Sequence, residues 1–234
     1  MQKFDLIVIG SGPAGEKAAV KAAYFGYKVA IIEKEELFGG AGTVTGTLPS
    51  KTLRETALYF SDKLEKGLYG IDRTFSQEAS MTDFMYRKNL VKDSSSKEVF
   101  DNLSRHHVSI FYGVASFEDA HTLHVQGKDH ISLFGEYIII ATGSYPYHPK
   151  NIPFDSKRVH DSDTILQLTR HPSSLCIVGA GVIGCEYATI FATIGTHVYL
   201  INDKKKIIPH LDEEISHELV KDMQSFGIDI LFNT

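Results

Sequence analysis

Two glycine clusters in the sequence have the spacing of a phosphate-binding turn. They consist of Gly10, Gly12 and Gly15, and of Gly179, Gly181 and Gly184. In the pattern G-x-G-x-x-G, the first glycine permits a tight turn and the second lets backbone N–H groups approach a pyrophosphate. The third glycine lets a helix pack closely on a strand. The chemistry that this pattern favours is the binding of a dinucleotide.

The residue at the end of the following strand indicates which nucleotide each cluster takes. In the first copy it is Glu33, which can accept hydrogen bonds from a ribose 2′-hydroxyl and would repel a 2′-phosphate. In the second copy it is Asn202, which tolerates either group, and lysines follow at 204–206. The lysines fit a solvated loop or a phosphate contact. The first site is therefore expected to bind an adenosine diphosphate such as that of FAD, and the second to bind NAD, NADP or both.

The elements that must position these residues form an internal repeat. Residues 10–34, GSGPAGEKAAVKAAYFGYKVAIIEK, align without a gap to residues 179–203, GAGVIGCEYATIFATIGTHVYLIND. Each copy follows a short apolar run and continues through a helical run to an apolar strand. The repeat predicts strand, turn, helix and strand twice, with a pyrophosphate at each helix N-terminus. The alternative is a duplicated scaffold that binds nothing.

The remaining segments predict the surrounding elements. Helices are expected over 51–66 and, with an interruption at the serines 94–96, over 75–107. Short alternating runs between 108 and 134 predict a small antiparallel meander, and a buried strand is expected at 137–141. A loop-like connector is expected at 151–163. After the second repeat, a helix at 212–226 and a strand at 228–232 are expected.

Composition excludes several classes of function. The net charge of −5 is unlike that of a nucleic-acid-binding protein, and no apolar run approaches the ~20 residues that span a membrane. The only two cysteines, Cys176 and Cys185, fit a reducing, cytoplasmic setting and are both expected to be small buried hydrophobes. No histidine spacing predicts a metal site.

Several motifs together resemble one protein family. They are GSGPAGEKAA, the GG…GTLPSK loop, IIIATGSYPYHP, HDSDTIL and GAGVIGCEYATIF, and the resemblance extends over essentially the whole chain. The chain resembles the N-terminal half of the pyridine nucleotide–disulfide oxidoreductases, and within them it is most similar to the soluble transhydrogenases. The fold implied is α/β, with two Rossmann-like dinucleotide-binding domains, both incomplete, and a small antiparallel β-meander.

The resemblance implies a site residue by residue. Along the FAD it implies Gly10, Ser11, Gly12, Pro13, Ala14, Gly15, Glu33, Lys34, Gly39, Gly40, Gly46, Lys51, Ala115, Ala141, Thr142 and Gly143. Along the nicotinamide nucleotide it implies Gly179, Gly181, Val182, Ile183, Gly184, Glu186 and Asn202. The catalytic residues implied are Lys51, beside the flavin N5, and Glu186, which would pair with it.

The sequence departs from the family at the loop that normally carries a redox-active disulfide. The two cysteine positions of that loop are Gly42 and Thr47 here. A disulfide needs two thiols with Cα atoms about 4.4–6.8 Å apart, so this loop cannot pass electrons to one. A dithiol or disulfide is therefore not an expected substrate.

The domains expected are an incomplete FAD-binding domain at 1–150 and the first βαβαβ half of an NAD(P)-binding domain at 151–234. The family's C-terminal dimerisation domain, which would make a homodimer, is absent from these residues. The function implied is hydride transfer between NADPH or NADH and NAD⁺ or NADP⁺ through FAD, and the 234-residue chain alone is expected to be inactive. The alternatives are an NAD(P)H diaphorase or quinone reductase, and a catalytically inactive nucleotide-binding protein.

Overall fold

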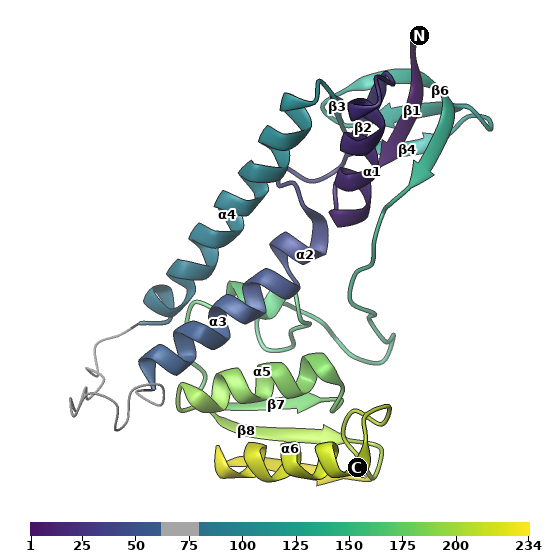
Figure 1. Ribbon diagram of the computed structural model, residues 1–234. Helices are drawn as coiled ribbons and strands as arrows, with labels where there is room; N and C mark the ends of the chain where they lie inside the picture. The colour runs from purple at the N-terminus through teal and green to yellow at the C-terminus, as the bar shows by residue number, and fades with distance from the viewer. Residues whose placement is uncertain (62–79) are drawn as a thin grey trace. The chain divides into compact units, whose positions relative to one another are not determined.

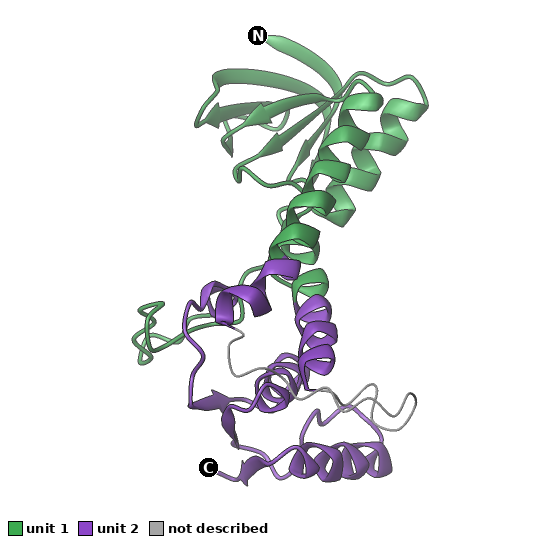
Figure 2. Cartoon of the chain, turned by 90° about the vertical axis from the view of Figure 1, so that its left-hand side faces the viewer, with its two compact units in different colours: residues 1–49, 89–163 green, residues 50–88, 164–234 purple. Residues whose placement is uncertain are grey.

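The computed structural model describes residues 1–61 and 80–234. The chain divides into two compact units (Figure 2). Unit 1 comprises residues 1–49 and 89–163, and unit 2 comprises residues 50–88 and 164–234. Residues 50–88 thus group with the second glycine cluster, although they precede the boundary expected near residue 150. The assignment of an FAD domain and an NAD(P) domain to these regions stays a prediction.

Unit 1 is built around a mixed sheet (Figure 1). Its elements include β1 (Gln2–Ile9), α1 (Pro13–Tyr24), β2 (Val29–Glu33), α2 (Gly40–Val44), β3 (Ser109–Tyr112), β4 (Val114–Phe117), β5 (Thr122–Gln126) and β6 (His130–Ile140). The strand order is β3-β2-β1-β6-β5-β4. The pairs β3–β2, β2–β1 and β1–β6 are parallel, whereas β6–β5 and β5–β4 are antiparallel. The expected α/β class with a parallel-dominated sheet is confirmed.

The parallel strands of unit 1 are apolar on both faces because both faces are covered. On one face, Val8 and Ile31 are buried with Ala19 of α1. On the opposite face, Ile7 and Ala30 are buried with side chains of the antiparallel strands. Successive residues of a strand point to opposite faces, so β1 contributes to both cores.

Two expectations about the strands of unit 1 were wrong. The run at 109–112 forms β3 and pairs in parallel with β2, so the antiparallel meander consists of β4, β5 and β6. The strand expected at 137–141 is the end of the longer β6 and is not buried: Tyr137 is 71% exposed and Ile140 is 65% exposed. Among the described residues, nothing covers these side chains.

Helices α3 (Thr47–Phe60) and α4 (Met81–Arg105) connect the two regions of the chain, and each contributes residues to both units. α4 runs through the serines at 94–96 without the interruption expected there. A tertiary contact explains the difference, because the buried Ser96 Oγ accepts a hydrogen bond of 2.7 Å from the backbone N–H of Phe38. The expected helical residues 62–66 and 75–79 lie outside the described residues.

Unit 2 contains a three-stranded parallel sheet of order β7-β8-β9. Its elements are the 3-10 turn η1 (Thr164–Gln167), β7 (Ser174–Val178), α5 (Val182–Thr193), β8 (His197–Asn202), α6 (Glu213–Ser225) and β9 (Ile228–Phe232). This confirms the expected order of strand and helix. The core contains Phe191, Leu200 and Met223, each 0% exposed, together with Leu53 of α3 and Phe84 of α4.

The two cysteines differ in their surroundings. Cys185 on α5 is buried as expected, and burial raises the pKa of its thiol to about 11. Cys176 was also expected to be buried, but it is exposed on β7. Its neighbours along the strand, Leu175 and Ile177, point to the other face of the sheet. There they are half-buried against the core of unit 2. The opposite face of the strand has no cover among the described residues of unit 2.

No described helix has the length and apolar character needed to cross a membrane.

Candidate functional site

In unit 1, the first glycine cluster forms the turn from β1 to α1. Gly10 has a φ of +99°, and a Cβ built on it would lie 2.4 Å from the carbonyl oxygen of Ala141. A Cβ on Gly15 would lie 1.9 Å from the carbonyl oxygen of Gly10. Neither position can hold a side chain without movement of the backbone. The roles expected for the first and third glycines, a turn and a close helix–strand approach, therefore match the structure.

Gly12 occupies the N-cap position of α1, and Pro13 begins the helix. No side chain caps the first N–H groups of α1, so these donors and the positive end of the helix dipole are available to an anion. A Cβ on Gly12 would come no closer than 4.0 Å to Gly40. Gly12 is therefore not required by packing within the protein, which is the observation expected if a ligand must approach its backbone. Ala14 follows in the first turn.

Glu33 ends β2 beside this turn and is buried, with 6% of its surface exposed. Its Oε2 atom accepts hydrogen bonds from the Ser11 backbone N–H at 2.9 Å and the Ser11 hydroxyl at 2.6 Å. Its Oε1 atom accepts a hydrogen bond from the Glu35 backbone N–H at 2.9 Å. A carboxylate has about four acceptor positions, and these three hydrogen bonds leave one of them open.

A second glycine pair faces the same turn. Gly39 has a φ of +101°, and its N–H donates to Ser11 Oγ at 3.3 Å. Gly40 has a φ of +56°, and a Cβ built on it would lie 3.0 Å from the Gly12 Cα. This close approach requires glycine at 40 and places the loop next to the N-terminus of α1. Gly46 lies at the other end of α2, where its N–H bonds the Ala41 carbonyl.

The carboxyl end of β6 lies next to the same turn. The N–H of Ala141 donates to the Ile9 carbonyl at 2.8 Å, and the exposed Thr142 and Gly143 follow it. Because β2, β1 and β6 are neighbours and parallel, their carboxyl ends meet at one edge of the sheet. Ligands of open α/β sheets bind outside this edge.

A pocket of about 150 Å³ lies beside the end of β2. Its lining residues include Lys34, Tyr112, Gly113, Gly127 and Lys128. This volume is smaller than the ~300–1,000 Å³ of a pocket that holds a whole drug-sized ligand. The pocket is therefore large enough for only one part of such a ligand. Ala115, expected near the adenine, does not line it and packs instead against the core under β4.

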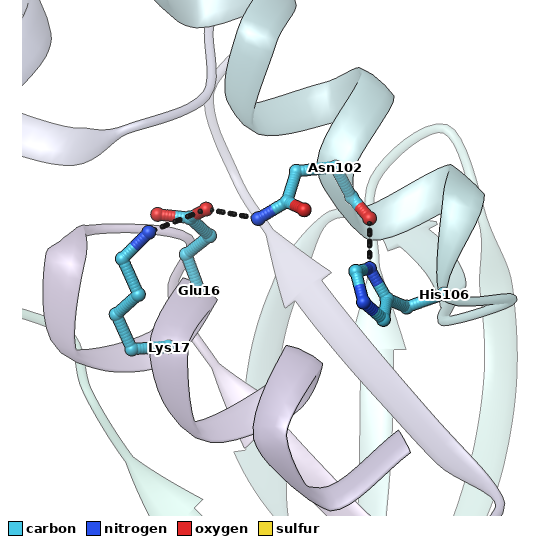
Figure 3. A network of polar contacts seen from close by, with 4 residues as sticks. All are labelled: Glu16, Lys17, Asn102 and His106. Atoms are coloured by element: carbon cyan, nitrogen blue, oxygen red, sulfur yellow. Dashed lines mark hydrogen bonds and ion pairs between the residues drawn. The ribbon is translucent and has the colours of Figure 1, made fainter. Parts of the chain in front are cut away.

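A polar network holds the first turn of α1 against α4 (Figure 3). The buried Glu16 carboxylate accepts a hydrogen bond of 2.6 Å from Asn102 Nδ2 and forms an ion pair with Lys17 at 3.1 Å. The backbone carbonyl oxygen of Asn102 lies 2.8 Å from His106 Nδ1. Sequence patterns did not identify this network because the contact that joins the two helices links Glu16 to Asn102, 86 residues away.

In unit 2, the second glycine cluster forms the equivalent turn from β7 to α5. Gly179 has a φ of +102°, and a Cβ on Gly184 would lie 2.0 Å from the Gly179 carbonyl oxygen. A Cβ on Gly181, the N-cap of α5, would meet nothing within 4 Å. The exposed side chains of Val182 and Ile183 begin the helix. The turn therefore repeats the geometry of the first one, with open space at its central glycine.

Asn202 ends β8 and is buried, with 6% of its surface exposed. Its Nδ2 atom donates to the carbonyls of Lys204 at 3.0 Å and Lys206 at 3.1 Å. Its Oδ1 atom accepts from the Ala180 N–H at 3.4 Å. Both amide hydrogens thus hold the lysine loop, while the side chains of Lys204 and Lys205 are exposed.

The pair expected to be catalytic lies in unit 2 on α3 and α5. Glu186 Oε1 accepts a hydrogen bond from Ser50 Oγ at 3.1 Å. Lys51 is exposed, and it forms no ion pair with Glu186 within 4.0 Å in the described structure. The resemblance implied that Lys51 of α3 would pair with Glu186 of α5. In the structure, the hydrogen bond between these two helices comes from Ser50, the residue before Lys51.

The sulfur-free loop is compact. Gly42 lies within α2, and a Cβ built on it would lie 3.3 Å from Pro13 Cγ. Thr47 is the first residue of α3. Within the described residues, no cluster of three or more His, Cys, Asp or Glu side chains could hold a metal ion.

Comparison with known proteins places this geometry in a family. The sequence profile of the pyridine nucleotide-disulphide oxidoreductases matches residues 4–234. A soluble pyridine nucleotide transhydrogenase of Mycobacterium tuberculosis (strain ATCC 25177 / H37Ra) is 38% identical over 235 residues, covering 99% of this chain and 50% of the relative. That of Yersinia pestis (strain Pestoides F) is 40% identical over 232 residues, covering 98% of this chain and 50% of the relative.

Solved structures give the same result. The HOCl-induced flavoprotein disulfide reductase RclA from Escherichia coli is 29% identical, with a TM-score of 0.85 over 98% of this chain and 49% of that chain. Its Cu(II) complex gives a TM-score of 0.86 over 100% of this chain and 50% of that one.

This chain spans about half the length of the curated relatives that it matches. The family and its flavoprotein structures imply FAD and NAD(P) as cofactors. Since the profile covers nearly every residue and the fold agrees, the resemblance seen in the motifs is confirmed: the chain belongs to the pyridine nucleotide-disulphide oxidoreductase family.

Proposed function

We propose that this chain binds FAD at the first glycine turn and a pyridine nucleotide at the second, and serves hydride transfer between NADPH or NADH and NAD⁺ or NADP⁺. The observation that carries the proposal is the arrangement at β1–α1, where Gly12 leaves room for a ligand beside the buried Glu33. The family and the transhydrogenase relatives support an NAD(P)-linked flavoprotein oxidoreductase.

The residues of unit 1 fit the adenosine diphosphate half of FAD. The uncapped N-terminus of α1 supplies donors and partial positive charge for the pyrophosphate. Glu33 retains one acceptor position for the ribose, and the pocket at Lys34 and Tyr112 is the right size for one further part of the ligand. FAD supplies the two-electron chemistry when it is bound, and the protein orients it and tunes its electrostatics.

In unit 2, the turn at Gly181 and the N-terminus of α5 fit a second pyrophosphate. Lys51 would contribute a cation near the reacting end of the flavin, where negative charge develops during hydride transfer. Glu186, which lies on α5 in the same unit, would be its partner. Because each region contains one of the two glycine turns, we propose that residues 1–150 form the FAD-binding domain and residues 151–234 the NAD(P)-binding domain.

The absence of thiols at positions 42 and 47 distinguishes this chemistry from disulfide reduction. Hydride transfer between nucleotides needs the donor carbon held about 3–3.5 Å from its acceptor, and it needs no thiol. We propose that the whole protein works as a cytoplasmic homodimer on pyridine nucleotides. The 234-residue chain, which spans half the length of its relatives, is expected to show little transhydrogenation alone.

Alanine at the two central glycines tests this assignment. Gly12 and Gly181 have φ values of −61° and −77°, which alanine adopts freely, and their added methyl groups meet no close protein atom. Gly12→Ala should lose bound flavin, measured as FAD per chain by visible absorbance, and keep nucleotide binding. Gly181→Ala should keep the flavin and bind NAD(P)H more weakly by calorimetry. Loss of both ligands in both variants, or of neither, would refute the two-site assignment.

A quinone reductase is the second candidate, and the same sulfur-free loop favours it. The two activities differ in the electron acceptor. Reduction of a thio-nicotinamide nucleotide by NADPH, followed at the analogue's own absorbance, reports transhydrogenation, whereas NADH-dependent reduction of a soluble quinone reports the alternative. Turnover of the quinone only, by the whole protein, would favour the second candidate.

A further inference from the structure

Three aromatic side chains are exposed at the turn between α1 and β2, and we call them the aromatic patch. Tyr24 is 70% exposed, Phe25 is 65% exposed and Tyr27 is 59% exposed. The rings of Tyr24 and Phe25 touch edge to face, with their centroids 5.6 Å apart. The turn lies at the end of unit 1 where β1 begins, because the backbone of Asp5 bonds that of Lys28 (Figure 1). The patch is therefore one helix length away from the first glycine turn, where α1 starts.

The internal repeat shows that this kind of turn does not need aromatic residues. The counterparts of the three aromatic residues in the second copy are Thr193, Ile194 and Thr196. The glycine within the turn is left-handed in both copies, with φ of +86° at Gly26 and +92° at Gly195. Thr196 is 4% exposed, and its hydroxyl donates to the Pro172 carbonyl at 3.0 Å. The fold thus builds the same turn without exposed rings, and a group of exposed apolar side chains that the fold does not need indicates an interaction site.

Two lysines add positive charge to the aromatic patch. The Lys21 Nζ atom lies over the rings of Tyr24 and Phe25, 5.3 and 4.9 Å from their centroids. The Lys28 Nζ atom lies 4.9 Å from the ring centroid of Phe4, at the start of β1. Within the described part of the chain, neither ammonium group forms an ion pair with a carboxylate. Their charges are therefore available to an anionic partner.

The combination of lysine with tyrosine and phenylalanine favours one class of partner. Protein–protein interfaces are enriched in aromatic residues and arginine but depleted in lysine. At a bilayer surface, aromatic rings lie at the level of the headgroups, and long lysine side chains extend their charge towards anionic lipids. We infer that the aromatic patch, together with Lys21 and Lys28, docks unit 1 reversibly on an anionic lipid surface.

Docking through this end leaves the first glycine turn open. α1 begins at that turn and ends at the aromatic patch, so the two lie at opposite ends of the helix. The inference goes beyond the proposed hydride transfer and does not depend on it, because none of the patch residues belongs to the proposed nucleotide sites.

Sedimentation with lipid vesicles tests the charge of the surface. The probe is vesicles of one part phosphatidylglycerol to two parts phosphatidylcholine, with vesicles of phosphatidylcholine alone for comparison. The 234-residue chain should sediment with the anionic vesicles only, and about 1 M salt should release it, because salt screens exposed charges. Lys21→Gln combined with Lys28→Gln should weaken binding about 30-fold, since each lysine near an anionic surface contributes about fivefold.

A matched control separates this effect from that of net charge. Lys150→Gln combined with Lys157→Gln removes the same charge from exposed positions of unit 1. Vesicle binding by this variant should change by less than about twofold, because the two residues lie outside the patch.

The aromatic rings are tested in the same assay. Tyr24→Thr combined with Tyr27→Thr gives the turn two residues that the second copy of the repeat carries, so this variant should fold. It should bind anionic vesicles about tenfold more weakly, because two rings no longer enter the headgroup region. Tyr59→Thr combined with Tyr86→Thr removes tyrosines that are 63% and 61% exposed elsewhere and should bind as the wild type does. Circular dichroism verifies that each variant is folded.

Fluorescence locates the contact independently. The chain contains no tryptophan, so a single one reports on its own surroundings. The emission of Tyr27→Trp should shift to shorter wavelength when anionic vesicles are added, because the ring leaves water. The emission of Tyr86→Trp should stay unchanged.

Four results would overturn the inference. They are failure to sediment with anionic vesicles, equal sedimentation with neutral vesicles, equal loss of binding in the patch and control variants, and an unshifted emission of Tyr27→Trp. If Tyr24→Thr with Tyr27→Thr instead lowers the sedimentation coefficient of the chain in the absence of vesicles, the patch binds a second copy of this chain and the lipid assignment is wrong.

Discussion

At the scale of single residues, we propose that Glu33 determines which ligand the first site can hold. Its carboxylate takes three hydrogen bonds from Ser11 and Glu35 and leaves one acceptor free. The carboxylate therefore fixes the glycine turn and, in the proposed complex, the ribose as well. A hydrogen bond to a charged group contributes about 1.5–3 kcal/mol.

Glu33→Gln should therefore weaken FAD binding by about 10- to 100-fold. The amide presents an N–H group where Ser11 needs an acceptor. The measurement is a titration of FAD into flavin-free protein, followed by fluorescence. Glu98→Gln, on the exposed side of α4, is the control and should bind FAD as the wild type does. Equal affinity in Glu33→Gln and the wild type would remove Glu33 from the site.

Asn202→Asp tests the second site at the same scale. The change keeps the acceptor for Ala180 and replaces the amide that donates to Lys204 and Lys206 with a negative charge. A carboxylate at this position repels a 2′-phosphate. NADPH binding should fall about tenfold more than NADH binding, measured by calorimetry. An equal loss of both would show that Asn202 acts by holding the lysine loop and does not face the ribose.

At the scale of the elements, the first glycine turn works only if α1 is fixed on its neighbours. Glu16 and Asn102 join its first turn to α4, 86 residues away in sequence. Because α4 lies in the connection between β2 and β3, this contact links the turn to the rest of unit 1.

Asn102→Ala leaves the buried Glu16 carboxylate without its amide donor. A buried polar group that loses its partner costs about 1–3 kcal/mol. We expect the free energy of unfolding in urea to fall by that amount, with FAD affinity falling as well. Asn89→Ala, at an exposed position of the same helix, should change the unfolding free energy by less than about 0.5 kcal/mol. Similar losses in the two variants would mean that the contact contributes nothing specific.

The connector that ends unit 1 gives a pH prediction. Partial burial raises the pKa of Asp163 above its ordinary 3.8, a hydrogen bond from Thr45 lowers it, and the neighbouring Asp161 charge raises it further. An acid with a raised folded pKa binds its proton more tightly when folded, so its contribution to stability declines as pH rises from 3.8 through the folded pKa.

Asp163→Asn removes this titration. The melting temperature of the variant should therefore gain on that of the wild type as pH rises from about 4 to 6. The gain should be small because the side chain is partly in solvent. Thermal melts of both proteins across this range measure it. A constant difference in melting temperature would contradict the assigned direction of the pKa shift.

Sequence reasoning predicted the elements well where the signal was local. The glycine spacing, the apolar strands and the helix expected from residue 212 are all short-range features. It failed where burial depends on distant chain. Cys176 and Tyr137 lie in apolar strands, and whether such strands are covered depends on which segment folds across them. The continuity of α4 depends on Phe38, and no pattern within the serine run shows that contact.

In the candidate site, too, features with a local sequence signal were predicted and features that depend on other contacts were not. The residues of both turns were predicted because the motif itself requires their geometry. The partners of Glu33 were not predicted, since Ser11 lies 22 residues earlier in the sequence. The role of Asn202 in holding the lysine loop was not predicted either, since an asparagine side chain can bond any of several nearby backbone groups. The ion pair between Lys51 and Glu186 was inferred from the resemblance and stays a prediction, whereas the hydrogen bond from Ser50 to Glu186 was not foreseen.

At the scale of the whole molecule, the proposal combines two nucleotide-binding turns with a loop that has lost its thiols. The resemblance implies that disulfide reductases of this kind carry two cysteines in this loop, and that Gly42 and Thr47 occupy those positions here. The number of electrons that the protein accepts therefore distinguishes a flavin alone from a flavin with a redox-active disulfide beside it.

Anaerobic reductive titration of the purified, flavin-loaded protein measures that count. A bound FAD accepts about two electrons, and a redox-active disulfide beside it would accept about two more. We expect stoichiometric flavin that is bleached completely after uptake of about two electrons per chain. Uptake of about four electrons per flavin, or a folded protein that binds no flavin, would contradict it.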